Sequence, residues 1–95
     1  MNEILTLISR EPGTDSITKR DAFCKVASIG QAEFYQSYAV DVHPEAKFVL
    51  ADYLDYNGET LADYNGKRYT ILRTYRTGQE LELTVAQASA EEAAL

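Results

Sequence analysis

The sequence predicts a mainly β protein: a small antiparallel sheet built around a meander, with one short helix in the loop between the second and third strands. Two Asn-Gly pairs, Asn57-Gly58 and Asn65-Gly66, lie between β-favouring runs and indicate tight hairpins. Several segments alternate apolar and polar residues, as half-buried strands do. Seven Tyr and three Phe with no Trp also favour strands.

Ninety-five residues are enough for one small hydrophobic core but not for two. Hydrophobic residues make up 45% and charged residues 25%, which is typical of a globular domain. We therefore expect one domain over residues 1–86 and an Ala-rich tail over residues 87–95. Ser89 and Glu92 have capping-box spacing, but so short a helix is marginal in water. The tail should be frayed, or ordered by a partner.

The first two strands are predicted from the apolar run at residues 4–8 and the alternating residues 21–29. Between them, residues 11–20 are polar and form either a loop or the splayed end of a long hairpin. The residues expected on one face of the second strand are Ala22, Cys24 and Val26.

Residues 31–39 favour a short helix, because Phe34 and Tyr38 are four residues apart and good helix formers precede them. Gly30 stands at the capping position and provides no side-chain oxygen for the first amides. The chain then returns to the sheet through Pro44, which favours an extended backbone before it.

The third strand is expected at residues 47–55, followed by a very short strand at residues 59–62 and a longer one at residues 67–76. Each Asn-Gly pair should form a type I′ turn between neighbouring strands. The last strand, residues 80–85, alternates strictly. On the third strand Phe48, Leu50 and Leu54 are in phase. On the longer strand Tyr69, Ile71 and Tyr75 share one face, and both faces have some apolar residues. Leu81, Leu83 and Val85 of the last strand should be core.

Charge and composition exclude several functions. A net charge of −6 and a pI near 4.6 argue against gripping a nucleic-acid backbone. Cys24 is the only cysteine and is expected to be a small buried residue, not half of a disulfide or a zinc pair. His43 has no partner at ligand spacing, and no serine has a recognisable base. We expect no enzyme activity, no cofactor, no metal, no membrane span and no targeting segment.

Tyrosine is more informative, because a core of this size cannot hide seven of them. Tyrosine suits protein–protein surfaces, since its ring can be buried while its hydroxyl stays hydrated. The residues expected at such a surface are Tyr53, Tyr56, Tyr64, Arg68, Arg73 and Tyr75.

Four stretches together suggest a family. They are Ser28-Ile29-Gly30-Gln31-Ala32-Glu33-Phe34-Tyr35, then Tyr56-Asn57-Gly58-Glu59, then Tyr64-Asn65-Gly66-Lys67-Arg68-Tyr69-Thr70-Ile71, and Arg73-Thr74-Tyr75. In this order, and with a Pro-containing return after the first, they resemble the head-closure proteins of long-tailed bacteriophages and prophages, also called stoppers or head–tail connector proteins. The resemblance covers roughly residues 21–85. The sequence departs from the usual family pattern at Gly30 and at residues 38–41.

The resemblance implies a barrel-like subunit whose copies form a ring, expected to be a dodecamer. The ring would lie between the adaptor protein below the portal and the tail-completion or tail-terminator proteins. DNA would pass through its channel without specific binding. The protein would be made in the bacterial host cytoplasm and reside at the head–tail junction of the virion. The channel or gating loop implied between the second and third strands includes Gly30, Gln31, Glu33, Phe34, Tyr35, Tyr38 and His43.

A second hypothesis remains open on the residues alone. A small barrel of this kind can also act as a monomeric peptide-binding or adaptor module that recognises a peptide along an exposed strand edge. Oligomerisation with a connector partner would distinguish the ring subunit from such a module.

Overall fold

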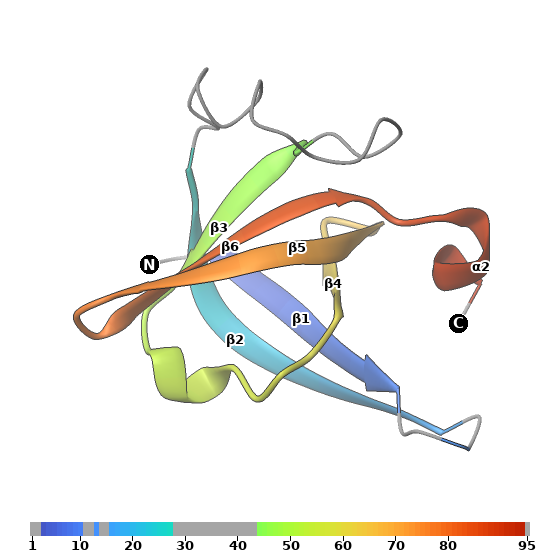
Figure 1. Ribbon diagram of the computed structural model, residues 1–95, viewed down its shortest axis with the longest axis horizontal. Coiled ribbons are helices and arrows are strands. Elements are labelled where there is room, and N and C mark those ends of the chain that lie inside the picture. The colour runs from blue at the N-terminus through green and yellow to red at the C-terminus, as the bar shows by residue number, and fades with distance from the viewer. Residues whose placement is uncertain (1–2, 11–12, 14–15, 28–43, 95) are drawn as a thin grey trace.

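The computed structural model describes residues 3–10, 13, 16–27 and 44–94. In this part of the chain six antiparallel strands close into a barrel in the order β1-β2-β3-β6-β5-β4 (Figure 1). The predicted fold class, mainly β and barrel-like, is confirmed. The strands are β1 (Glu3–Arg10), β2 (Ile17–Ala27), β3 (Ala46–Leu50), β4 (Leu61–Tyr64), β5 (Lys67–Thr77) and β6 (Glu80–Gln87). A 3-10 turn, η1 (Tyr53–Asp55), and a short helix, α2 (Ala90–Ala93), complete the described elements. The helix expected at residues 31–39 lies outside them.

β1 and β2 form one long hairpin. Their register runs without interruption from Glu3 opposite Cys24 to Arg10 opposite Ile17. Of the two alternatives for residues 11–20, the long hairpin is therefore correct for residues 17–20.

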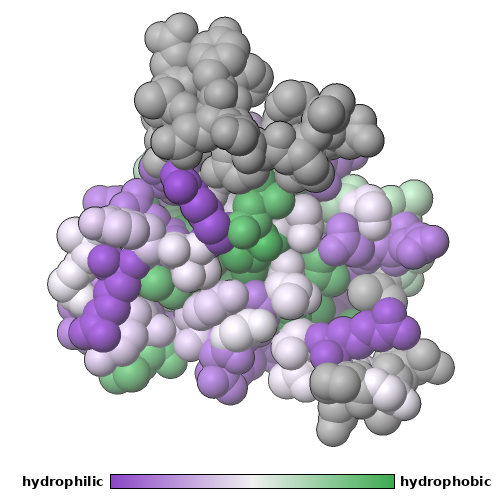
Figure 2. Space-filling model, viewed as in Figure 1, coloured by the Kyte–Doolittle hydropathy of each residue, from purple (hydrophilic) through white to green (hydrophobic). Residues whose placement is uncertain are grey.

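The core fills the barrel. Its buried members are Leu5, Leu7, Ala22, Cys24, Phe48, Leu50, Ala62, Leu81, Leu83 and Val85. The predicted inward face of β6 is confirmed, and so is the burial of Cys24. Val26 was predicted to share the face of Ala22 and Cys24, yet its side chain is 50% exposed. It lies at the rim, one residue before β2 ends, so the barrel interior does not enclose it. On the face drawn in Figure 2, hydrophobic residues form separate areas between hydrophilic ones.

The third strand is shorter than predicted. β3 ends at Leu50, and Asp52 begins η1 by accepting a hydrogen bond from the Leu54 amide on Oδ1, at 2.9 Å. Leu54, predicted to continue the apolar face, is therefore 66% exposed. The physical reason is topological: β3 pairs with β2 and β6, whereas β4 pairs with β1 and β5, so the chain must leave the sheet to pass between them.

The two Asn-Gly pairs differ in structure. Asn65 (φ 53°) and Gly66 (φ 81°) both have positive φ and join β4 to β5, as a type I′ hairpin requires. In the first pair only Gly58 (φ 83°) has positive φ. Asn57 does not, because Asn65 is the one non-glycine residue with positive φ in the described part of the chain. The hairpin predicted at Asn57-Gly58 is wrong, and the short strand falls at Leu61–Tyr64 instead of residues 59–62.

A β-bulge redirects the end of β5. The register with β6 shifts between Ile71, opposite Val85, and Arg73, opposite Thr84, so Leu72 is the additional residue. Tyr69 and Ile71 pack against the core. Tyr75 was predicted on the same face, but the bulge reverses the alternation, and the Tyr75 side chain is 65% exposed.

The C-terminal tail forms α2, whose first turn has a complete capping box. The Ser89 hydroxyl accepts from the Glu92 amide, and Glu92 Oε1 accepts from the Ser89 amide. Arg68 also donates to the Glu92 carbonyl oxygen at 3.0 Å. Contacts within the chain therefore hold this turn beside β5.

Candidate functional site

The predicted channel loop cannot be placed from the structure. Gly30, Gln31, Glu33, Phe34, Tyr35, Tyr38 and His43 all lie outside the described residues. What the structure does show is where this segment leaves and rejoins the barrel. Ala27, the last residue of β2, is paired with Lys47 at the start of β3, so the segment joins two adjacent strand ends.

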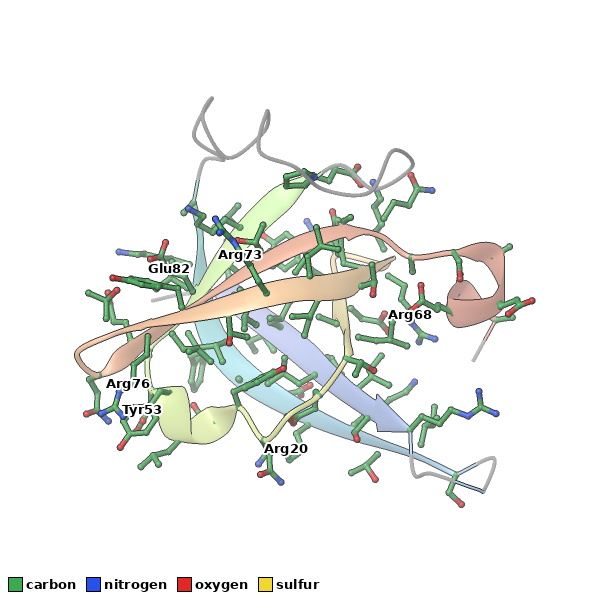
Figure 3. All side chains as sticks on the ribbon, in the orientation of Figure 1. Arg20, Tyr53, Arg68, Arg73, Arg76 and Glu82 are labelled. Carbon is green, nitrogen blue, oxygen red and sulfur yellow. The ribbon has the colours of Figure 1, made fainter. Side chains whose placement is uncertain are left out.

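Two of the six predicted interface residues, Tyr53 and Tyr56, have internal roles. The Arg76 guanidinium lies 3.5 Å from the centroid of the Tyr53 ring, and Figure 3 shows the pair beneath the β5–β6 hairpin. The Tyr53 amide also donates to the Gln79 carbonyl. The Tyr56 hydroxyl donates to the Glu59 carbonyl at 2.7 Å. Burial of the phenol, and to a lesser degree the nearby charge of Glu59, raises the pKa of Tyr56. Both rings stabilise the crossing segment, residues 51–60, which passes over the barrel end between β3 and β4.

Tyr64 and Arg68 are likewise used within the chain. The Tyr64 ring packs on Phe48 with the ring centroids 5.0 Å apart. Arg68 forms two hydrogen bonds with the Asp63 carboxylate, at 2.7 and 3.0 Å, across the β4–β5 hairpin. This hydrogen-bonded pairing lowers the pKa of Asp63 below its ordinary value. Figure 3 shows Arg68 beside α2, at the opposite end of β5 from Arg76.

Arg73 and Tyr75 remain at the surface, on the side of β5 that faces away from the core. They line an open groove of about 350 Å³ that also involves β3 and β6. Lys47 and Glu82 form an ion pair in it, with Nζ and Oε1 3.4 Å apart. The groove lining is Lys47, Arg73, Thr74, Tyr75, Glu82 and Thr84. It is amphipathic and of mixed charge, which suits a contact with another protein.

A second exposed apolar area lies on β1 and β2. Ile4 and Phe23 are direct register partners, and their side chains are 53% and 59% exposed. Sequence patterning did not single out this pair, because each residue fits the alternation of its own strand. Only the register brings the two side chains together.

Glu59 is a further residue that the sequence does not reveal. Its side chain is 4% exposed and pairs with Arg20 of β2, Nη2 to Oε2, at 3.0 Å. Its other oxygen accepts from the Asn57 amide, and Arg20 also donates to the Asp55 carbonyl. This carboxylate therefore fastens the crossing segment to β2.

Few groups in the described part of the chain offer catalytic or metal chemistry. No set of three His, Cys, Asp or Glu side chains there could hold a metal ion. Burial, reinforced by the charge of Glu3, raises the pKa of the Cys24 thiol to about 11, which makes it a poor nucleophile. The absence of an enzyme activity and of a cofactor stays a prediction. None of the described helices has the length and apolar character to span a bilayer.

Comparison with known proteins adds no identification. No protein-family model, curated protein or solved structure matches this chain.

Proposed function

We propose that this chain is a ring-forming head-closure subunit of the head–tail connector of a long-tailed bacteriophage or prophage. The observation that carries the proposal is the combination of a small closed barrel with a long segment, residues 28–43, between the adjacent ends of β2 and β3. The sequence resemblance implies this same fold and places the channel loop at this same connection. The Tyr64–Ile71 part of the resemblance also forms the hairpin that its Asn-Gly pair predicts.

The surface supports self-assembly into a ring. A ring is built from heterologous contacts, so each subunit needs two unlike surfaces. The barrel has two exposed areas with aromatic residues: the β1–β2 patch (Ile4 and Phe23) and the β5 patch (Arg73 and Tyr75). β3 and β6 lie between them in the barrel order. The two patches also differ in chemistry, since the first is apolar and the second is basic and aromatic.

The remaining parts of the proposal follow from this role. The ring, expected to be dodecameric, would dock on the adaptor protein below the portal and on tail-completion or tail-terminator proteins. A net charge of −6 suits a conduit through which DNA passes without specific binding. The protein would act at the head–tail junction of the virion by assembly and gating, with no catalytic turnover.

The test is the mass of the full chain in solution, alone and mixed with connector proteins from the same genome, by light scattering after gel filtration. We expect a large ring with those partners. Phe23→Ser and Tyr75→Ser should each weaken the ring, whereas the control Leu54→Ser, equally exposed but outside both patches, should not. All three variants should keep the wild-type denaturation midpoint. A chain that stays monomeric with every connector protein would refute the proposal.

One observation favours the second candidate, a monomeric peptide-binding module. Beyond Ile71, β5 has β6 on one side and no strand on its other side in the described part of the chain. A protein that remains a monomer and saturates with one peptide would support this candidate.

A further inference from the structure

Among the described residues, no strand pairs with the outer backbone edge of the distal half of β5. β5 is eleven residues long, but β4 pairs only with Lys67–Thr70. The ladder on that side ends where the Ile71 amide donates to the Thr60 carbonyl, at 2.9 Å. Residues 73–77 are all exposed, and Figure 1 shows the β5–β6 hairpin extending away from the body of the barrel. We call residues 73–77 the β5 edge.

The hairpin geometry identifies which peptide groups face outward along the β5 edge. Gly78 (φ 60°) and Gln79 form the two-residue turn, so Thr77 and Glu80 are the closing pair that exchanges hydrogen bonds. Hydrogen-bonding pairs then alternate along the ladder. The peptide groups of Arg76 and Thr74 consequently point away from β6, toward the side that has no strand among the described residues.

The charge of β5 is opposite to that of the whole chain. The chain has 15 acidic and nine basic residues, yet the sequence of β5, KRYTILRTYRT, contains four of the basic residues and no acidic one. Lys67 and Arg68 are paired with Glu45 and Asp63 in the proximal half. Arg73 and Arg76 lie in the distal half, where Arg73 also has an interaction within the chain. Stacking on Tyr53 and a hydrogen bond from Nε to the Gly78 carbonyl hold the Arg76 guanidinium beside the β5 edge.

The same features argue against direct pairing between the β5 edges of two copies. Pairing two β5 edges would bring four arginine side chains to one seam, and like charges on paired strands are destabilising. A bulge and charged side chains are also the usual protection of an edge against self-pairing. An acidic strand from a different protein would meet attraction in place of this charge repulsion.

We propose that the β5 edge is a strand-addition site for an extended acidic segment of a partner protein. The Thr74 and Arg76 peptide groups would provide the main-chain hydrogen bonds, and Arg73 and Arg76 would provide the charge selectivity. The inference applies to a ring subunit and to a monomeric module alike, so it does not rest on the proposed function.

The experiment uses the full chain labelled with ¹⁵N and two synthetic decapeptides. One alternates glutamate and valine, and the other replaces every glutamate with lysine. We expect the acidic peptide alone to bind, with affinity falling as salt increases. On binding, the Thr74 and Arg76 amides should show slower hydrogen exchange, because they become hydrogen-bonded.

A proline variant tests the edge directly. Thr74→Pro removes an amide that faces away from β6, so the β5–β6 ladder keeps its hydrogen bonds. It should weaken binding of the acidic peptide at least tenfold, while the matched control Thr74→Ala, which keeps the amide, should bind within about twofold of the wild type. Urea denaturation of both variants checks that they fold.

Three results would overturn the assignment. The first is equal binding of the lysine peptide. The second is binding of the acidic peptide that leaves exchange at Thr74 and Arg76 unchanged, or that Thr74→Pro does not weaken although the variant is folded. The third is self-association of the chain that Thr74→Pro abolishes, which would place a second copy on the edge.

Discussion

At the scale of single residues, Glu59 shows how a turn-proximal carboxylate can become a structural anchor. It follows Gly58 in a polar stretch, where an acid is usually solvated. In the barrel its carboxylate is almost fully buried and joins Arg20 on β2 to the Asn57 amide. A buried carboxylate is tolerated only when it is paired and hydrogen-bonded, and both conditions are met here.

We expect Glu59→Gln to lower the free energy of unfolding by about 1.5–3 kcal/mol, the range for a hydrogen bond to a charged group. The amide keeps the shape of the side chain but removes the charge that faces Arg20. Urea denaturation at pH 7 measures the effect.

Glu82→Gln is the matched control, because Glu82 is also ion-paired but its side chain is 30% exposed. Glu82→Gln should lower the free energy of unfolding by about 0–1 kcal/mol, as for other surface ion pairs. Equal losses in the two variants would contradict the anchoring role of Glu59.

At the scale of elements, the repeated tetrapeptide Asp-Tyr-Asn-Gly adopts two different structures. At residues 63–66 it closes a hairpin, because β4 and β5 are neighbours in the barrel. At residues 55–58 it follows a 3-10 turn, because β3 and β4 are not neighbours and the chain has to cross the barrel end. Local turn chemistry is the same in both places, and strand order decides between the outcomes.

This difference predicts unequal effects of one substitution. Asn65→Ala should cost about 1 kcal/mol, because Ala lacks the short polar side chain that makes positive φ tolerable for Asn. Asn57→Ala should change the free energy of unfolding by no more than about 0.5 kcal/mol, the usual range at an exposed site. Thermal denaturation of the two variants side by side makes the comparison. Similar losses would mean that residues 55–58 also form a type I′ turn.

At the scale of the whole molecule, closure of the barrel accounts for the burial of its centre. β1 and β4 close it with three pairs, Thr6–Asp63, Leu7–Ala62 and Ile8–Leu61. Cys24 lies on β2 opposite Glu3 of β1 and Leu50 of β3, and its side chain is inaccessible. A reagent can therefore reach the thiol only when the barrel opens.

Cys24 should consequently report global opening. At pH 8 and without denaturant, we expect a thiol reagent to label it at least about a hundredfold more slowly than in urea, because burial and a pKa of about 11 both suppress the thiolate. The measurement is the labelling rate against urea concentration. Rapid labelling of the folded protein would show that the barrel opens locally near β2.

The sequence by itself determined the mainly β class, the inward faces of β2 and β6 near their centres, and the second Asn-Gly hairpin. These follow from periods and turn preferences within a few residues. It also singled out six interface candidates. Of these, Arg73 and Tyr75 line the outer groove, whereas the contacts of Tyr53, Tyr56, Tyr64 and Arg68 stabilise the barrel itself.

Only the tertiary structure decided the partner of Glu59, the bulge that turns Tyr75 outward, and the β5 edge beyond Ile71 that no described strand covers. Each depends on which strands are neighbours and where their pairing stops. That information lies in contacts between residues far apart in the chain, such as Arg20 with Glu59, and no local pattern contains it.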